Sequence, residues 1–102
     1  MNFRWEWDEE KNRQNIRKHG MDFADAPELF SGHAPFFVCH DSWETYGEDR
    51  WKGVGLLGGS VVVVVVFSEP REGTIRIISL RKANKTERER YEGEVKNRLG
   101  QS

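Results

Sequence analysis

The sequence predicts an α+β fold in which N-terminal helices and a C-terminal helix pack on a four-stranded antiparallel sheet. Three observations predict this class. A capped, charged helical pattern covers residues 8–19, four short β-type segments follow between residues 35 and 81, and a second helical pattern covers residues 86–99. The connections between the β-type segments are short, which favours a meander of sequential antiparallel strands.

Length and composition indicate one small folded domain, residues 1–102. The chain is 32% charged, but its 36% hydrophobic content and its twelve aromatic residues (four Trp, two Tyr and six Phe) argue against disorder. The formal net charge is −1 and the isoelectric point is near 6.3, so the chain has no overall attraction for nucleic acid. Any nucleic-acid site must therefore be a local concentration of cations.

No sequence signal for secretion, for a membrane segment or for a cofactor is found. Cys39 is the only cysteine, and the N-terminal residues lack the apolar core of a signal peptide, so we expect a cytoplasmic protein. The longest apolar run, residues 61–67, is far shorter than the ~20 residues of a membrane helix. The histidines and Cys39 match no metal-ligand spacing, and no Gly-rich phosphate loop opens a helix. We therefore expect neither a metal nor another cofactor.

The N-terminal part predicts an extended lead-in followed by two helices. Apolar residues alternate with charged ones over residues 3–7. Asp8 is placed to cap a helix that ends at His19, with Gly20 as its left-handed C-terminal cap. This helix has only Ile16 as an aliphatic residue, so we expect a thin buried stripe. A second helix after Asp22 should be distorted, because a proline at position 27 removes a backbone hydrogen bond.

The middle of the chain predicts the strands. The segments 35–40 and 48–57 precede a two-residue hairpin turn at Gly58 and Gly59. The valine-rich run 61–67 should be the central strand because it is apolar on both faces. Residues 68–73 should turn the chain into the last strand. A strand covered by helices on one face only would need a further cover, from large side chains, from residues 22–30 or from a partner protein.

The last strand and the last helix meet in a cationic joint. Strict alternation would place Ser79 and Arg81 on one face of the strand and Arg76 on the other. Thr86 and Glu89 fit a capping box, and Tyr91 begins an apolar stripe that continues through residues 95 and 99 toward the core. A helix start beside a sheet edge suits an anion such as phosphate. The cations at this joint that we expect to contact it are Arg81, Lys82, Lys85 and Arg88.

These residue types are sufficient for cleaving RNA without a metal. The reaction needs a base for the 2′-hydroxyl proton, an acid for the 5′ oxygen, and cations for the charge that builds on the phosphate. Glu48 or His19 could be the base, and His19 or Tyr91 the acid. Two structural alternatives stay open, since a histidine at a helix end often stabilises the helix dipole and Tyr91 lies on an apolar stripe. The strand cations expected to bind the phosphate are Arg50, Lys52, Arg76 and Arg81.

Three segments of the chain together resemble one known family. WDEEKNRQNIRKHGMDFADAPELF, YGEDRWKGVGLL and RIISLRKANKTERERY, in this order and spacing, are similar to the BrnT toxins of type II toxin-antitoxin pairs. The resemblance implies a RelE-like fold and a ribonuclease that halts translation. It also implies neutralisation by a BrnA-like, ribbon-helix-helix antitoxin that carries the pair to operator DNA. Carried onto this sequence, it points to Lys18, His19, Glu48, Arg50, Arg76, Ser79, Arg81 and Tyr91.

This sequence departs from the family pattern at two positions. Pro27 interrupts a segment that is otherwise a plain helix in the family, and Leu80 replaces a small residue before Arg81. The reading we favour is a cytoplasmic endoribonuclease toxin acting on mRNA, with no membrane association. The alternative is a non-catalytic interaction module that acts with a DNA-binding partner in transcriptional autoregulation. The two readings differ in whether Glu48, Arg50 and Arg81 converge on one surface.

Overall fold

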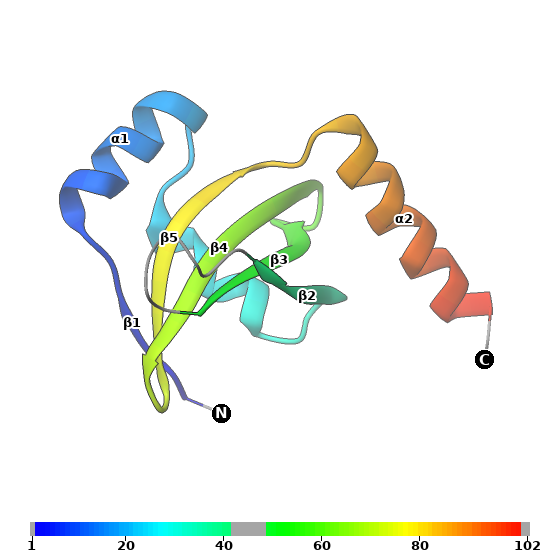
Figure 1. Cartoon of the computed structure of the whole chain (residues 1–102). Coiled ribbons are helices and arrows are strands. Elements are labelled where there is room, and N and C mark those ends of the chain that lie inside the picture. The colour runs from blue at the N-terminus through cyan, green and yellow to red at the C-terminus, as the bar shows by residue number, and fades with distance from the viewer. Residues whose placement is uncertain (1, 42–48, 101–102) are drawn as a thin grey trace.

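The computed structural model describes residues 2–41 and 49–100, which form one mixed sheet with helices on both sides (Figure 1). The α+β class expected from the sequence is confirmed. In chain order the elements are β1 (Arg4–Glu6), α1 (Glu9–His19), the 3₁₀ helix η1 (Phe23–Phe30), β2 (Phe36–Asp41), β3 (Arg50–Leu57), β4 (Val61–Arg71), β5 (Thr74–Lys82) and α2 (Lys85–Gly100).

The sheet has five strands in the order β1-β5-β4-β3-β2, so the expected four-stranded antiparallel sheet is wrong in two respects. The extended lead-in forms a strand of its own, and it pairs parallel to β5, with Trp5 opposite Ile75. A parallel partner lies at the other end of the chain, and local sequence carries no signal for such a pair. The other three pairings are antiparallel, and the valine strand β4 lies at the centre as expected.

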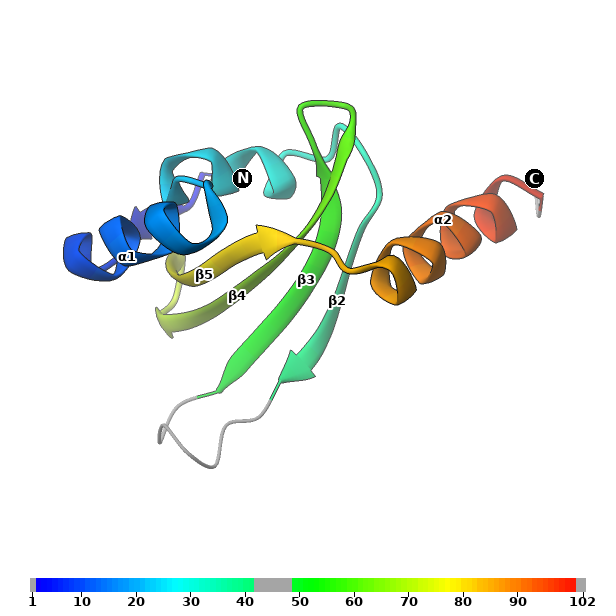
Figure 2. The same cartoon turned by 90° about the horizontal axis from the view of Figure 1, so that it is seen from above.

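The core lies between the sheet and η1. Phe23, Ala26 and Leu29 of η1 are buried against Val63 and other side chains of the same sheet face. Figure 2 shows η1 and α2 on opposite sides of the sheet. The distortion expected at position 27 is observed, because this segment forms a 3₁₀ helix with a proline inside it.

Helix α1 is held by polar side chains and not by an apolar stripe. It begins after Asp8, whose side chain accepts from two backbone N–H groups, and ends at Gly20 with φ 70°, as expected. Ile16, however, is exposed, while Asn15 is buried. The amide of Asn15 donates to the carbonyl of Leu80 over 2.8 Å and accepts from the N–H of Leu80 over 3.2 Å. Asn15 therefore closes the edge of β5 beyond the end of β1.

Two turns differ from the expectation. The β3–β4 hairpin has a three-residue loop, because Leu57 pairs with Val61 and the N–H of Ser60 donates to the carbonyl of Leu57. Strand β4 also continues to Arg71, so most of the segment expected as a turn is strand. The pairing of β4 with β5 shifts register between Ser68 and Arg71, and this irregularity accommodates the proline at position 70 within the strand.

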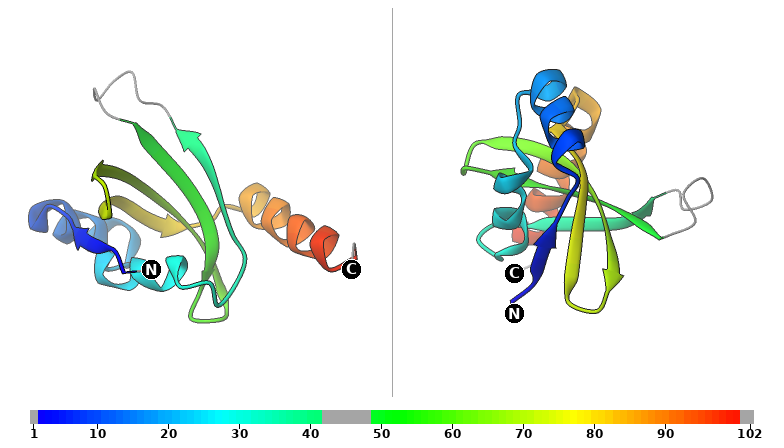
Figure 3. Two further views of the ribbon diagram at one scale, coloured as in Figure 1. Left: turned by 90° about the horizontal axis from the view of Figure 1, so that it is seen from below. Right: turned by 90° about the vertical axis from the view of Figure 1, so that its left-hand side faces the viewer.

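Helix α2 packs on the sheet only through its first half. Tyr91 is buried, whereas Val95 is half-buried and Leu99 is 73% exposed, so the stripe expected to join the core does so at Tyr91 alone. Figure 3 shows why, since α2 leaves the sheet and extends away from the rest of the molecule. Among the residues described, no helix has both the length and the apolar character needed to cross a membrane.

Candidate functional site

A bulge in β5 brings together cations that strict alternation would separate. Ser79 pairs with Val66, but Ile77 pairs with the next residue of β4, Phe67, so Ile78 has no partner in the register. This extra residue shifts the alternation by one position. Arg76, Ser79 and Arg81 therefore lie on one face of the sheet, which corrects the expectation that the two arginines point to opposite faces.

The same face continues across β4 to β3. Register partners share a face, so Lys52 lies beside Val66, and Val66 lies beside Ser79. One position along the strands, Val64 separates Val54 from Arg81. We call this side of the sheet, opposite to η1, the open face. Its half-buried polar residues on β3 and β5 are Arg50, Lys52, Arg76, Ser79 and Arg81.

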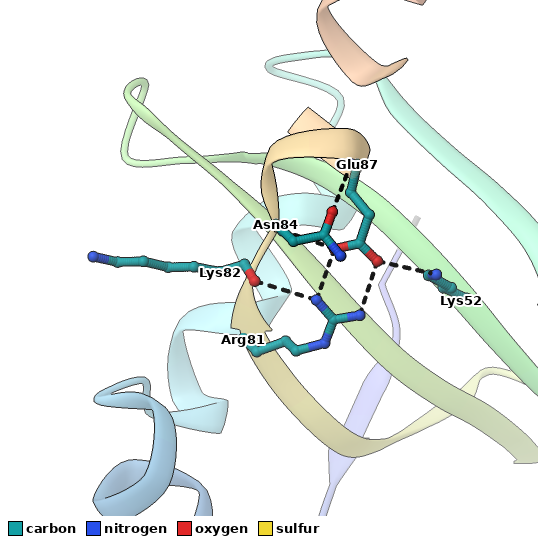
Figure 4. Close-up of polar contacts among 5 residues, drawn as sticks. All are labelled: Lys52, Arg81, Lys82, Asn84 and Glu87. Carbon is teal, nitrogen blue, oxygen red and sulfur yellow. Dashed lines mark hydrogen bonds and ion pairs between the residues drawn. The ribbon is translucent and has the colours of Figure 1, made fainter. Parts of the chain in front are cut away.

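At the joint between β5 and α2, one carboxylate holds two of these cations (Figure 4). Arg81 donates from Nη1 to Oε1 of Glu87 over 2.8 Å and from Nη2 to Oε2 over 2.9 Å. Lys52 Nζ lies 3.3 Å from the same Oε2. Glu87 thus bridges β3 and β5 above the valines of β4, and a bidentate pair of this kind also fixes the plane of the guanidinium.

In this cluster of Lys52, Arg81 and Glu87, the hydrogen bonds between Arg81 and Glu87 favour the ionised forms of both groups. The hydrogen bonds from Arg81 are the largest cause that lowers the pKa of Glu87, to about 2, and Lys52 and the N–H of Asn84 act in the same direction. The pKa of Arg81 is raised, chiefly by the hydrogen bonds to Glu87. Glu87 is therefore a carboxylate at any physiological pH, and it is too weak a base to accept a proton there.

The start of α2 is capped by a different pair from the one expected. Asn84 Oδ1 accepts from the N–H of Glu87 over 2.8 Å, and Glu87 Oε1 accepts from the N–H of Asn84 over 2.8 Å. This is a capping box displaced by two residues from Thr86 and Glu89. The N-x-x-E spacing of residues 84–87 was available in the sequence, and it would have identified Glu87 as well.

A groove of about 330 Å³ lies beside the cluster, between α2 and the open face near β2 and β3. Its floor includes Phe37, Val54 and Tyr91. The Tyr91 hydroxyl donates to the carbonyl of Pro35 over 2.8 Å, and its ring packs against Phe37 with 5.5 Å between centroids. Burial raises the pKa of Tyr91. These contacts give Tyr91 a role in anchoring α2.

The remaining predicted site residues are spread more widely. His19 is half-buried at the end of α1, next to the exposed Lys18, and no described hydrogen bond or ion pair joins either of them to Glu87. Arg76 donates to Glu6 from Nε over 2.8 Å, at the other end of the open face. The three other joint cations are exposed to solvent: Lys82, Lys85 and Arg88.

Two further expectations concern the base and a metal. Glu48, the alternative base, lies outside the described residues. Arg50, its expected neighbour, lies on the open face and is paired in register with Asp41. Within residues 2–41 and 49–100, no group of three or more His, Cys, Asp or Glu side chains is arranged to hold a metal ion.

Comparisons with known proteins agree on one family. A family model described as "Ribonuclease toxin, BrnT, of type II toxin-antitoxin system" matches residues 7–87. The chain is similar to the crystal structure of the Brucella abortus ribonuclease toxin BrnT, with 31% sequence identity and a TM-score of 0.65. That similarity covers 82% of this chain and 100% of the other. No curated protein matches. The family match includes the polar residues of the open face and ends at Glu87.

Proposed function

This chain belongs to the BrnT family of ribonuclease toxins of type II toxin-antitoxin systems, and we propose that it is a metal-independent endoribonuclease. It cleaves mRNA in the cytoplasm and thereby stops translation. Membership of such a system implies an antitoxin partner. We propose that this partner is a BrnA-like ribbon-helix-helix protein, and that the pair contacts operator DNA through the antitoxin.

The observation that supports a nuclease most directly is the open face. The bulge at Ile78 places Arg76, Ser79 and Arg81 on the side of the sheet that also carries Lys52. In a chain with a net charge of −1, this is a local concentration of phosphate-binding groups on a rigid support. This gathering of cations from two strands is the ground on which we propose a nuclease and not a module that only binds a partner protein.

The proposed reaction uses the RNA itself as the nucleophile. A base removes the 2′-hydroxyl proton, the 2′ oxygen attacks the phosphorus, and the bond to the 5′ oxygen breaks as an acid protonates that oxygen. Arginine suits the charge that builds on the phosphate because its planar fork donates to two oxygens at once. We propose Arg81 and Arg50 for this role, with Lys52, Arg76 and Ser79 as further phosphate contacts.

The proposed reaction also needs a base and an acid for proton transfer. Glu48 or His19 would be the base, and His19 or Tyr91 the acid. The hydrogen bond from Tyr91 to the Pro35 carbonyl would have to break before Tyr91 could protonate a leaving oxygen, which favours His19 as the acid. The exposed cations Lys18, Lys82, Lys85 and Arg88 would guide RNA toward the site from two sides.

Expression in bacteria tests the proposal as a whole. The chain is produced alone, and then together with the product of its neighbouring reading frame, while growth and mRNA integrity are followed. We expect arrest and cut mRNA with the chain alone, and recovery of both with the partner. Normal growth with intact mRNA would exclude the nuclease and leave the non-catalytic interaction module as the better account.

The role of Arg81 is tested with a matched arginine on another element. Arg81→Ala should reduce the cleavage rate of purified protein by about 100-fold, because a donor to the developing phosphate charge is lost. Arg13→Ala, which removes an exposed arginine of α1 that pairs with Glu10, should leave the rate unchanged. Equal rates for the two variants would remove Arg81 from the site.

A further inference from the structure

Arg81 presents two hydrogen-bonding edges, and the fold occupies only one of them. Glu87 takes the edge formed by Nη1 and Nη2, and the second hydrogen of Nη1 points to the carbonyl of Lys82, 3.3 Å away. The other edge, made by Nε and the second Nη2 hydrogen, has no hydrogen-bond partner within the described part of the chain. Figure 4 shows Nε on the side of the guanidinium away from Glu87.

The unoccupied edge has the geometry that phosphate oxygens accept. Nε and Nη2 donate two parallel hydrogen bonds, and this fork recognises phosphate as well as carboxylate. The side chain of Arg81 is 34% exposed, so an anion can reach it. Val64, the register partner of Arg81 on β4, is buried. This apolar neighbour strengthens the electrostatic interaction between the guanidinium and an anion bound to it.

Glu87 is itself held in place, so it is not a mobile competitor for the guanidinium. Its carboxylate accepts from the N–H of Asn84, and its own N–H donates to the side chain of Asn84. Lys52 Nζ lies beside the oxygen that faces β3. The two cations and one carboxylate leave one net positive charge for a ligand.

We propose that Glu87 is a positioning residue, which locks the guanidinium of Arg81 so that its Nε and Nη2 edge receives the reacting phosphate of the RNA. This inference rests on the proposed nuclease function. Glu87 does not touch the RNA; it fixes the plane of Arg81 and sets the place of Lys52. A guanidinium that is ordered before the reaction loses less conformational freedom in the transition state than a free one.

The test compares Glu87→Gln, Arg81→Ala and the double variant, using purified full-length protein and one RNA substrate. Glutamine can keep the hydrogen bond to Asn84, but it brings a donor where Arg81 needs an acceptor. Glu87→Gln should lower kcat about 10-fold and change KM less than threefold. The double variant should be no slower than Arg81→Ala alone, because Glu87 acts through Arg81.

Two controls separate positioning from loss of stability. Glu89→Gln alters an exposed carboxylate on the same helix and should leave kcat unchanged. Phe23→Leu destabilises the core on the other side of the sheet, and it should leave kcat unchanged below its melting temperature. A second readout is the NMR resonance of the Arg81 side-chain Nε–H, followed as 2′-O-methyl RNA, which cannot be cleaved, is added. This resonance should shift in the wild type and much less in Glu87→Gln.

The outcomes distinguish this inference from the proposed function. If the wild type cuts no RNA, both fail. If the wild type cuts RNA and Glu87→Gln is as fast or binds RNA more tightly, the positioning role is wrong and the nuclease stands. Additive losses in the double variant, or a similar drop in kcat with Phe23→Leu, would also overturn the positioning role.

Discussion

Glu87 connects α2 to two strands that are not neighbours in the sheet. One carboxylate ties Arg81 of β5 to Lys52 of β3, and the same side chain completes the cap of α2. A partly buried, bidentate and capped pair contributes more than an exposed ion pair, since the hydrogen bonds are charge-assisted and the geometry is held by the helix start. The position of α2 relative to the open face therefore depends on the ionisation of this residue.

Acid should weaken this connection in a defined range of pH. The pKa of Glu87 falls from 4.5 to about 2 on folding, so its contribution to stability is complete above pH 4.5 and is lost as the pH drops toward 2. In urea unfolding at neutral pH, Glu87→Gln should cost about 1–3 kcal/mol. Measured at about pH 3, the difference between wild type and variant should be roughly half as large.

The variant comparison isolates Glu87 from other acids. The pKa values of Glu6 and Asp22 are also lowered, the first mainly by a hydrogen bond from Arg76 and the second mainly by the N–H of Ala24. Both groups titrate in the wild type and in Glu87→Gln alike, so they cancel in the difference. A difference that stays constant from neutral pH to pH 3 would contradict the role assigned to the Glu87 carboxylate.

At the scale of secondary structure, two glycines of β3 on the core face make room for the ring of Phe36. A Cβ on Gly53 would lie 2.4 Å from Cζ of Phe36, and one on Gly55 would lie 2.9 Å from Cδ1 of the same ring. That ring also packs against Phe30, with 4.9 Å between centroids, so it is not free to move aside. The glycines therefore let β2 place a phenylalanine across β3 and close one end of the core.

Alanine at two glycine positions should have opposite effects on stability. Gly53→Ala forces a contact with Phe36, and we expect it to lower the free energy of unfolding by about 1–3 kcal/mol. A Cβ on Gly93 of α2 would meet nothing within 4 Å, so Gly93→Ala should raise the free energy of unfolding by about 0.5–1 kcal/mol through helix propensity. Urea unfolding of both variants measures the two changes in the free energy of unfolding. No change for Gly53→Ala would mean that Phe36 has room to move.

For the molecule as a whole, charge is segregated although the total is nearly zero. The open face carries four cations from β3 and β5: Arg50, Lys52, Arg76 and Arg81. Three carboxylates lie beside them, since Glu6 pairs with Arg76, Asp41 lies opposite Arg50, and Glu87 holds Arg81 and Lys52. A single strand of RNA would therefore meet a small net positive charge on this face of a slightly acidic protein. Such a surface binds phosphates with a salt dependence set by the few groups it holds.

The salt dependence of RNA binding should show whether RNA contacts the cations of the open face. With 2′-O-methyl RNA, log Kd should rise linearly with log salt concentration, and Lys52→Ala should reduce the slope by about 0.7, as expected for one lost phosphate contact on a single strand. Lys11→Ala, an exposed lysine on α1, should leave the slope unchanged. Equal reductions from both variants would show that RNA binds through general charge and not through the open face.

Local sequence alone determined the elements whose signals are local. The cap at Asp8, the left-handed Gly20, the distortion at Pro27 and the central place of the valine strand all follow from side-chain chemistry within a few residues. The family was also within reach of the sequence, because three segments in a fixed order carry it. The cations of the site could be named for the same reason, as residue types at one joint.

Only the tertiary structure decided how these parts meet. The parallel pairing of β1 with β5 and the bulge at Ile78 depend on contacts between distant segments, and the bulge alone puts Arg76 and Arg81 on one face. Helix α2 has too few apolar residues to stay on the sheet, so Leu99 projects into solvent. The pairing of Glu87 with Arg81 and Lys52 needs three elements in place at once, which no periodicity in the chain encodes.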